Sequence, residues 1–476
     1  MPQGVLPYKY EEERKPGGIT SLAGLPLYLE LAVALGLPKS IERHFTLRPT
    51  QGWTDCQMIL SLVLLSLAGG DCVDDLKILE ADEGFCRLLG RMEPEASSSR
   101  WRAKKSRTVP SPSAVFRWLS CFRTEEASVQ GSASIPYSAA LAGFVHLNGD
   151  LLSSVQKKDP VSTATLDVDA TLAETHKKEA LFCYEGYKAY QPLNVYWAET
   201  ELMAHTEFRD GNVPANYDLL RVFTKTLDNL PEGVERIRLR ADAAGYAHEL
   251  LAYCDSGDHE RFGRIEFAIS CPVTDAFKKE VARLPREEWK RLDSRREWAE
   301  VGYVPTELVH KEHLYRYLAI REALRQPVLP GMELPFQTLD YQGTQYKLHG
   351  LVSNMDWRGD RLVAFAYERC GKSEEAHAIL KEDLFGGKLP SGNFGENAAW
   401  WWATVLAFNL NAAMKKFALG PSWAAKRMKA IRFSMINLPG RIIEHARQLI
   451  IRLVKDHPSF TLLVEARQRI MRLAPS

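Results

Sequence analysis

The stretch Thr165-Leu-Asp-Val-Asp-Ala-Thr171 places two carboxylates in a segment that otherwise has the composition of a buried strand. Side chains alternate between faces along a strand, so Asp167 and Asp169 share one face and the apolar residues share the other. An ionised carboxylate in a sheet core costs several kcal/mol unless a cation or hydrogen-bond donors compensate for it. Two interpretations remain open on this stretch alone: a metal ligand, or an Asp that caps a turn at the strand end.

The segments after this strand predict an α/β core. Apolar and aromatic runs over 192–198 and 202–208 predict the second and third strands, and 216–230 has helical spacing. The alternating run Arg236–Ala241 predicts a fourth strand that ends at Asp242, and a helix through Cys254 leads to a fifth strand over 264–271. Three antiparallel strands followed by helix, strand, helix and strand is the order of an RNase H-like core. In that fold, carboxylates belong in the first strand and at the end of the fourth.

Residues 272–350 are expected to interrupt this core as an inserted, β-containing subdomain. Basic and acidic residues crowd 278–299, and short β-like runs follow at 334–339 and 345–349. After the insertion, Leu362–Tyr367 has the composition of a strand, and 371–384 has helical spacing. Trp289 and Trp298 in the insertion are candidates for stacking on a flipped base, although core packing is the commoner role of tryptophan.

The first part of the chain is expected to be helical. Residues 1–20 suggest a loose arm, and helical apolar spacing runs from Leu22 to about Gly90. A basic run over 100–107 precedes Pro110-Ser-Pro-Ser113, where Ser113 is a plausible N-cap for a helix that carries Arg117. A basic-flanked helix after a turn is typical of a helix-turn-helix element that contacts DNA, and also of an ordinary surface helix.

Composition and charge indicate a globular protein whose positive charge is concentrated near one end of the chain. The chain has 476 residues, 45% hydrophobic and 25% charged, which indicates a globular protein of several domains. The formal net charge is +1, yet 415–472 holds 13 Lys and Arg against three acidic residues, a local balance of +10. A positive field at one end of the chain suits phosphate, although charged helix faces are often merely solvated.

Cysteine usage and hydropathy indicate the compartment. The eight cysteines include no Cys-x-x-Cys pair, and the N-terminus lacks the basic and apolar regions of a signal peptide. The longest apolar stretches, 58–68 and 398–408, are shorter than the roughly 20 residues that span a bilayer. We therefore expect a reduced cytoplasmic protein without a membrane segment.

Three acids are candidates for a catalytic metal site: Asp169, Asp242 and Glu374, with sequence gaps of 73 (242 − 169) and 132 (374 − 242). Two divalent ions held by carboxylates about 3.5–4 Å apart can activate a nucleophile on one side of a phosphodiester and stabilise the leaving oxygen on the other. Mg²⁺ prefers such carboxylate oxygens. Three convergent carboxylates would therefore be sufficient for phosphoryl transfer.

On several motifs together, the chain resembles the DDE transposases of bacterial insertion sequences, in particular the group with a Tyr-Arg-Glu-Lys signature and a β insertion before the last acid. The resemblance covers most of 1–415. The motifs are Leu166-Asp-Val-Asp-Ala-Thr171, Gly186-Tyr-Lys-Ala-Tyr-Gln-Pro-Leu193, Arg209-Asp-Gly-Asn212, Arg240-Ala-Asp242 and the segment from Tyr367 through Phe385. In the family, the signature Tyr and Lys lie seven residues before and after the acid, as Tyr367 and Lys381 do around Glu374. The chain departs at the signature Arg, where Cys370 stands and Arg369 comes one residue early.

The resemblance implies an α/β fold with an RNase H-like catalytic core interrupted by the β-containing insertion. An N-terminal helical DNA-binding domain and a basic helical C-terminal region are expected to flank it. The expected division of the chain is 1–160, the N-terminal helix-turn-helix-like domain; 161–271, the first part of the core; 272–350, the insertion; 351–414, the second part of the core with the catalytic Glu; and 415–476, the basic region.

The resemblance also implies an activity. A DDE transposase cleaves the ends of its element and joins the 3′-hydroxyls to target DNA by two-metal-ion phosphoryl transfer. Asp169, Asp242 and Glu374 would hold two Mg²⁺ or Mn²⁺ ions, with Asp167 as the fallback for Asp169, and Glu374 is preferred over Glu375 because it alone keeps the signature spacing. The expected DNA contacts are Tyr367, Arg369, Lys381, Arg117, Lys426 and Arg427.

The expected partner is double-stranded DNA, as element terminal inverted repeats and as target, bound by a homodimer in the bacterial cytoplasm at the nucleoid. Two alternatives stay open. A metal-dependent nuclease could use the same acids without strand transfer, and a catalytically inactive DNA-binding relative is hinted at by the displaced arginine.

Overall fold

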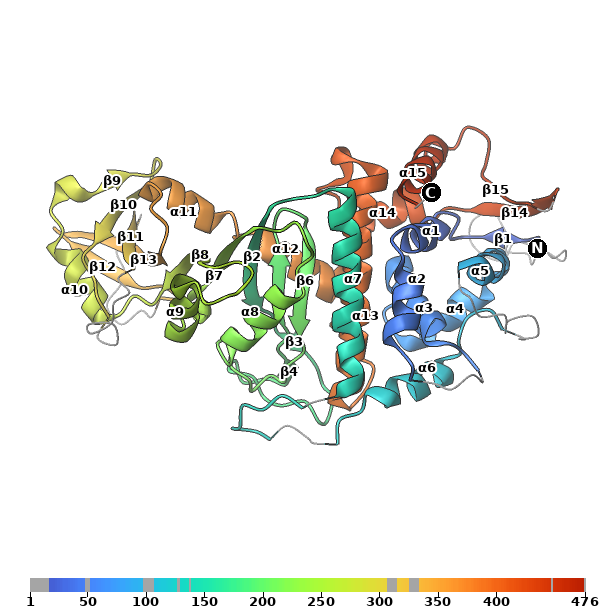
Figure 1. Cartoon of the computed structure of the whole chain (residues 1–476), viewed down its shortest axis with the longest axis horizontal. Coiled ribbons are helices and arrows are strands. Elements are labelled where there is room, and N and C mark those ends of the chain that lie inside the picture. The colour runs from blue at the N-terminus through green and yellow to red at the C-terminus, as the bar shows by residue number, and fades with distance from the viewer. Residues whose placement is uncertain are drawn as a thin grey trace, which may run out of the picture. The chain divides into compact units, whose positions relative to one another are not determined.

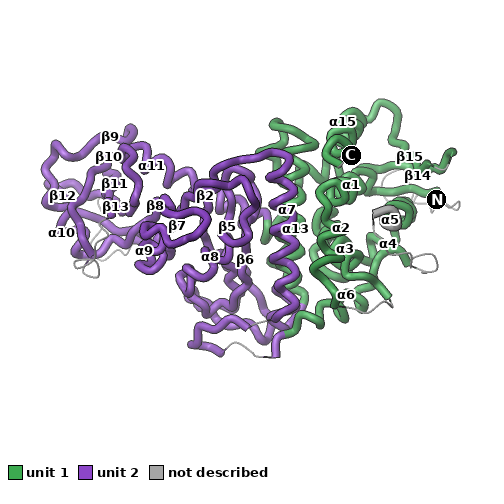
Figure 2. Tube along the Cα trace, viewed as in Figure 1, with its two compact units in different colours: residues 1–123, 380–390, 399–476 green, residues 124–379, 391–398 purple. Residues whose placement is uncertain are grey.

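The computed structural model describes residues 17–47, 52–96, 107–125, 129–136, 138–305, 315–324, 334–446 and 448–474. The chain forms two compact units, coloured separately in Figure 2. Unit 1 comprises 1–123, 380–390 and 399–476, and unit 2 comprises 124–379 and 391–398. The boundaries that we expected near 160 and 415 do not coincide with this division. Most of the loose arm expected over 1–20 and of the basic run expected over 100–107 lies outside the described residues, but Ile19–Thr20 at the end of the arm form a strand, β1.

Unit 2 is built on a mixed sheet of ten described strands (Figure 1). The first five occur in the order β6-β5-β2-β7-β8. β2 pairs antiparallel with β5 and parallel with β7; β5 pairs antiparallel with β6, and β7 pairs parallel with β8. These strands are β2 (Thr163–Ala170), β5 (Leu193–Trp197), β6 (Leu202–Glu207), β7 (Arg236–Ala241) and β8 (Glu266–Cys271). The five strands follow one another along the chain as the sequence predicted, and the first three are antiparallel as expected.

Strands from the inserted segment extend the same sheet. The path continues from β8 through β13, β11 and β10 to β9, with β12 paired to β13. The segment therefore contains the expected β structure, but it is hydrogen-bonded to the core rather than separate from it. These elements are α10 (Asp275–Arg283), η6 (Arg286–Glu288), β9 (Lys290–Arg291), β10 (Arg296–Val301), β11 (Arg316–Ala323), β12 (Thr338–Tyr341) and β13 (Thr344–Ser353).

Helices accompany the sheet and its connections. Helix α7 packs on β6, where the side-chain amide of Asn148 donates to the carbonyl oxygens of Met203 and Ala204 at 3.0 and 2.9 Å. The remaining elements of unit 2 are η4 (Ala139–Leu141), α7 (Ala142–Lys158), β3 (Ala173–Glu174), β4 (Ala189–Tyr190), α8 (Leu219–Asp228), η5 (Ala243–Gly245), α9 (His248–Ser256), α11 (Gly359–Tyr367) and α12 (Lys372–Ala378). α12 continues into the π-helix η8 (Ile379–Asp383), of which only Ile379 belongs to unit 2.

The strand expected over Leu362–Tyr367 is wrong, because this segment belongs to helix α11. Leu362, Val363 and Phe365 are buried in one cluster with Trp298, an arrangement that fits one helix face rather than alternating strand faces. A run of six apolar residues is compatible with either element by periodicity alone.

Trp298 is 3% exposed in this core, and Trp289, 7% exposed, lies under the guanidinium of Arg321 at 3.7 Å from the ring centroid. Both side chains are therefore used in packing.

Unit 1 combines the two ends of the chain. Strand β1 pairs with β14, which pairs with β15, and the Tyr28 hydroxyl donates to Asn411 at 2.8 Å. The elements are β1 (Ile19–Thr20), α1 (Pro26–Ala34), α2 (Leu37–His44), α3 (Asp55–Ala68), η1 (Val73–Asp75), α4 (Leu76–Ala81), α5 (Glu83–Ala96), α6 (Pro112–Leu119), η3 (Ser120–Phe122), η9 (Met414–Leu419), η10 (Pro421–Trp423), α14 (Met428–Ile431), η11 (Arg432–Ile436), β14 (Gly440–His445), β15 (Gln448–Arg452) and α15 (Phe460–Leu473); α13 (Phe394–Ala413) contributes residues to both units.

Two local expectations in unit 1 change. The N-cap of α6 is Ser111, whose hydroxyl accepts from the amide of Ala114 at 3.2 Å, and not Ser113. Pro112 occupies the first helical position, where its missing N–H costs nothing, so the cap is the residue before it. The region over 415–476, expected to be helical, also contains the β14–β15 hairpin.

All eight cysteines are unpaired thiols. Within the described part of the chain no single helix is long and apolar enough to cross a membrane; α3 and the segment Val73–Ala81 pass such a test only as a pair bent by 95°.

Candidate functional site

Asp169 and Asp242 lie side by side at the carboxyl ends of two parallel strands. The register of β2 and β7 pairs Val168 with Ala241, so the next residue on each strand is an aspartate. Neighbouring strands lie about 4.8 Å apart, which brings the two carboxylates to the same edge of the sheet. The strand order that the sequence predicts is therefore what brings together two acids 73 positions apart in the sequence.

The surroundings of Asp242 disfavour its charge. Burial raises the pKa of Asp242, the negative charge of Asp169 raises it further, and the positive charge of Arg369 acts in the opposite direction. The Asp242 carboxylate also caps η5, where it accepts from the amide of Ala244 at 2.9 Å. An aspartate whose charge is disfavoured by burial and by a second aspartate beside it belongs to a donor set that a divalent cation would stabilise, with oxygen ligands of the kind Mg²⁺ prefers.

Both acids line a cavity of about 670 Å³. Much of its wall is apolar, but it also includes the side-chain amides of Gln191 and Asn212. Gln191 is 4% exposed. The side-chain oxygens of both residues, Oε1 of Gln191 and Oδ1 of Asn212, are buried without a hydrogen-bond partner. The remaining lining residues are Gln130, Gly131, Ala133, Val168, Ala170, Phe182, Cys183, Tyr184, Leu193, Gly211, Val213, Pro214, Ala215, Leu219, Ala244 and Gly245.

Asp167 has a different environment from Asp169. Its carboxylate is fully buried and pairs with both ends of the Arg240 guanidinium, with oxygens 2.6 and 2.9 Å from Nε and Nη2. Arg240 also donates to the carbonyl of Phe365 at 2.9 Å. The Asp167 carboxylate is thus fully engaged inside the sheet, and Asp169 is the acid of this strand that faces the cavity.

Three side chains around α12 approach one oxygen of Asp169. Nη1 of Arg369 lies 3.0 Å from Oδ2, the hydroxyl of Ser373 donates to it at 2.8 Å, and Nδ1 of His377 lies 4.0 Å away. Arg369 was expected to contact DNA. In the structure it provides the positive charge next to the paired aspartates.

Glu374 and Glu375 are exposed on α12, and neither lines the cavity. Ser373 and His377 mark the side of the helix that faces Asp169. At 100° per residue, Glu374 lies about 60° from His377 around the helix axis and Glu375 about 160°. Glu375 contributes to the raised pKa of Tyr196, which is due mainly to burial and then to Glu201 and Asp167. Glu374 is therefore the glutamate closer to the Asp169 side.

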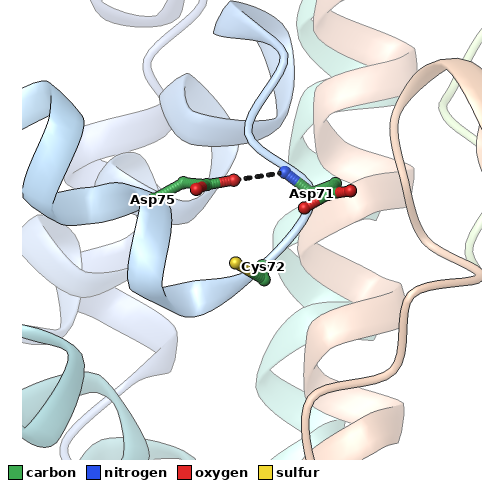
Figure 3. Close-up of side chains that lie close together, drawn as sticks. All are labelled: Asp71, Cys72 and Asp75. Carbon is green, nitrogen blue, oxygen red and sulfur yellow. Dashed lines mark hydrogen bonds between the residues drawn. The ribbon is translucent and has the colours of Figure 1, made fainter.

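The three predicted acids do not form a closed ligand cluster. Among the described residues, one group of at least three His, Cys, Asp or Glu side chains has ligand atoms all within 4.8 Å of one another: Asp71, Cys72 and Asp75 in unit 1 (Figure 3). There the amide of Asp71 donates to Asp75 at 2.9 Å. Asp71 and Cys72 are exposed, and exposed acidic groups are common without a bound ion.

The remaining signature residues have separate surroundings. Tyr367 stacks on His349 with ring centroids 6.0 Å apart, and the Arg296 guanidinium lies 5.0 Å from its ring centroid, so it packs against the inserted strands. Burial raises the pKa of Tyr367. Lys381 lies in η8, in the segment 380–390 that belongs to unit 1.

The basic residues of unit 1 divide into two kinds. Arg117 and Lys426 are exposed. Arg427 pairs with Asp383 through two contacts of 2.7 and 2.8 Å. Arg432, from the same basic stretch, donates to the carbonyls of Ser66, Leu67 and Asp383. Two of the arginines are thus committed to intramolecular contacts, whereas Lys426 and the exposed Lys429 face solvent.

Sequence reasoning did not assign roles to Ser373, His377, Gln191 or Asn212. Ser373 and His377 are four residues apart and flank Glu374, a spacing that places both on one helix face. Gln191 and Asn212 occur within two motifs that carry the family resemblance, at 186–193 and 209–212. Their position in the cavity wall could not be derived from spacing, because it depends on how the loops after β4 and β6 fold back.

Comparisons with known proteins give one clear result. A family model described as "Transposase DDE domain group 1" matches residues 11–475. No curated protein matched the chain. Among solved structures, the cryo-EM structure of a piggyBac transposase synaptic complex with hairpin DNA is similar at a TM-score of 0.41 and 10% sequence identity, over 94% of this chain and 85% of that one.

Proposed function

The chain belongs to the group 1 family of DDE transposases, and from that premise we propose that it cleaves the ends of a mobile DNA element and joins the 3′-hydroxyls to target DNA. Members of this family generally use divalent metal ions. The observation that carries the proposal is the pairing of Asp169 and Asp242 at the ends of parallel strands, on the wall of a cavity. The strand order β6-β5-β2-β7-β8 supports an RNase H-like core around them.

In this proposal Asp169, Asp242 and Glu374 hold two Mg²⁺ or Mn²⁺ ions. When bound, these ions supply a reactive oxygen nucleophile and charge stabilisation for the leaving oxygen. The chain's own part is to position the acids. Arg240 fixes β2 through Asp167, the amide of Ala244 orients Asp242, and Ser373 and His377 bring the helix that carries Glu374 to Asp169.

Double-stranded DNA is the proposed partner, as terminal inverted repeats and as target. We assign contacts with its phosphates to exposed or partly exposed cations: Arg117, Lys426 and Lys381. Tyr367, Arg369 and Arg427 have intramolecular partners in the DNA-free protein and would need to exchange them. Joining two ends needs two active sites, so a homodimer on DNA in the bacterial cytoplasm completes the proposal.

A second candidate is a DNA-binding relative without catalytic activity. Two observations favour it: Glu374 is exposed and not part of the cavity wall, and Cys370 stands where the family signature has arginine. A metal-dependent nuclease without strand transfer is a further outcome that the same experiment separates.

The test uses the full-length protein and DNA taken from the regions that flank its gene. One substrate is intact, and the other is pre-cleaved with a free 3′-hydroxyl at the end. We expect Mg²⁺-dependent cleavage of the first and joining of the second to a plasmid. Asp169→Asn, Asp242→Asn and Glu374→Gln should abolish both reactions while DNA binding is retained, and Glu375→Gln is the matched control that should react normally.

Each other result has a defined meaning. Cleavage without joining identifies a nuclease, and absence of both reactions with DNA binding intact identifies the inactive relative. If Glu375→Gln is dead and Glu374→Gln cuts normally, the third acid is Glu375 and the signature is out of register by one residue.

A further inference from the structure

A single guanidinium pairs with Asp169 at the cavity edge. Nη1 of Arg369 lies 3.0 Å from Oδ2 of Asp169, and the Arg369 side chain is only 15% exposed. Within the described residues, Oδ1 of Asp169 accepts no hydrogen bond. Arg369 therefore occupies the position of a counter-cation, on one oxygen of the carboxylate only.

Arg369 lies in the short connection between α11 and α12. A hydrogen bond holds the residue before it, and the backbone turns sharply two residues after it. Glu368, directly before it, accepts from the buried Arg240 at 3.3 Å. Gly371, two residues after it, has φ of +87°, a left-handed conformation that favours glycine and starts α12. Since the long Arg369 side chain ends at Asp169 while its backbone belongs to this connection, it can leave the carboxylate without any change in β2.

A divalent cation and this guanidinium would compete for the same carboxylate. Like charges a few ångströms apart repel strongly in a partly buried site, so an ion at Asp169 and Asp242 binds more weakly while Arg369 stays. The planar guanidinium is also suited to phosphate oxygens. We propose that Arg369 is a positioning residue that neutralises Asp169 in the DNA-free protein and moves to a DNA phosphate when a divalent ion binds, which couples ion binding to DNA binding.

This inference rests on the proposed function, because it assumes that Asp169 and Asp242 hold the ion. The coupling is reciprocal by thermodynamic linkage: DNA that receives Arg369 strengthens ion binding, and the ion strengthens DNA binding by the same factor. In the absence of DNA, the protein binds divalent ions weakly.

The first experiment measures Mn²⁺ binding to the DNA-free, full-length protein by electron paramagnetic resonance of the free ion. Arg369→Gln should bind Mn²⁺ about tenfold more tightly than the unmodified protein, because the competing charge is gone. Arg369→Lys keeps a positive charge and should stay within about threefold of the unmodified protein. Ser373→Ala, which removes a donor to the same oxygen but no charge, should change the affinity less than Arg369→Gln does.

The matched control is Arg358→Gln. Arg358 is an exposed arginine of the same unit that pairs with Asp360, and its removal should leave Mn²⁺ affinity unchanged. Circular dichroism establishes that each variant is folded, and Arg369→Lys provides the charge-retaining comparison if Arg369→Gln is unstable.

The second experiment repeats the Mn²⁺ titrations with a saturating duplex of arbitrary sequence. DNA should tighten Mn²⁺ binding to the unmodified protein, and this gain should be several-fold smaller in Arg369→Gln. Equal gains in the two proteins, or weaker Mn²⁺ binding by DNA-free Arg369→Gln, would overturn the inference.

Asp169→Asn separates failure of this inference from failure of the metal site. If Asp169→Asn loses Mn²⁺ binding while Arg369→Gln shows no gain, the site stands and the role of Arg369 is wrong. If Asp169→Asn binds Mn²⁺ normally, the ion does not bind at Asp169, and the proposed metal site and the role of Arg369 both fail.

Discussion

Asp167 and Asp169 show how two identical side chains on one strand face acquire different roles. Asp167 is compensated by a buried arginine that holds it with two contacts, whereas Asp169 lies at the strand end beside a second carboxylate and a cavity. The sequence predicted the shared face and the need for compensation. It could not predict that Arg240, 73 residues later, would satisfy Asp167, because that contact depends on the parallel register of β2 and β7.

At Asp242 we predict a pH-dependent gain of stability on removal of the charge. Burial and Asp169 raise its pKa above the ordinary 3.8, so the folded protein binds this proton more tightly than the unfolded chain does. The ionised carboxyl therefore costs folding free energy at neutral pH, and this cost fades as the pH falls through the raised pKa. Asp242→Asn keeps an oxygen for the Ala244 amide and should raise the urea midpoint of the metal-free protein at pH 7.

The gain in stability should disappear below pH 3.8, where the carboxyl of Asp242 is protonated in both the folded and the unfolded protein. Asp360→Asn is the comparison: hydrogen bonds from Arg358 lower the pKa of that half-buried carboxyl to about 2, so its removal should not raise the midpoint at any pH. An Asp242→Asn midpoint below that of the unmodified protein at pH 7 would contradict the conclusion that the ionised Asp242 carboxyl destabilises the metal-free protein.

At the level of elements, alternation and turn residues predicted the five core strands, while α11 was mistaken for a strand. The correct and the mistaken prediction both depend on whether the apolar residues alternate with polar ones. Strands with one polar face alternate visibly, as Thr165–Ala170 does, but a short run of apolar residues packs equally well as a buried strand or a buried helix face. Only the partner surface decides, and for α11 that partner is Trp298 of an inserted strand.

Helix α11 depends on close approach to Trp298. A Cβ atom at Gly359 would overlap the Trp298 ring, which is buried and cannot move without displacing its neighbours. Gly359→Ala should therefore lower the free energy of unfolding by about 1–3 kcal/mol through overpacking, measured by urea denaturation. Gly302→Ala is the matched control, because nothing lies within 4 Å of a Cβ at that exposed position. Equal stability of the two variants would mean that α11 packs differently.

On the scale of the whole molecule, the basic C-terminal segment contains two kinds of cation that charge counting could not separate. Arg432 holds carbonyls of α3 and of 380–390, whereas Lys426 and Lys429 face solvent. Arg432→Ala should cost about 2–3 kcal/mol of stability, because it leaves partly buried carbonyls without a donor.

Lys426→Gln with Lys429→Gln should leave stability unchanged and weaken binding to duplexes of any sequence.

The DNA-binding part of this prediction is measured through salt dependence. Each lost phosphate contact flattens the slope of log K against log salt by about 0.9, so the double lysine variant should lose up to about 1.8. An unchanged slope would show that these lysines interact with solvent and not with DNA phosphates. A stable Arg432→Ala variant would show that the three segments of unit 1 hold together without it.

The pairing of β1 with β14 has a consequence for how the protein is made. A ribosome releases Ile19 long before its partner Arg441, so β1 must wait without its partner strand until nearly the whole polypeptide has been synthesised. The ten-stranded sheet, by contrast, has all its strands once residue 353 has emerged. A premature stop codon before β14 would therefore have an effect at the opposite end of the chain, where β1 would be left without a strand to pair with.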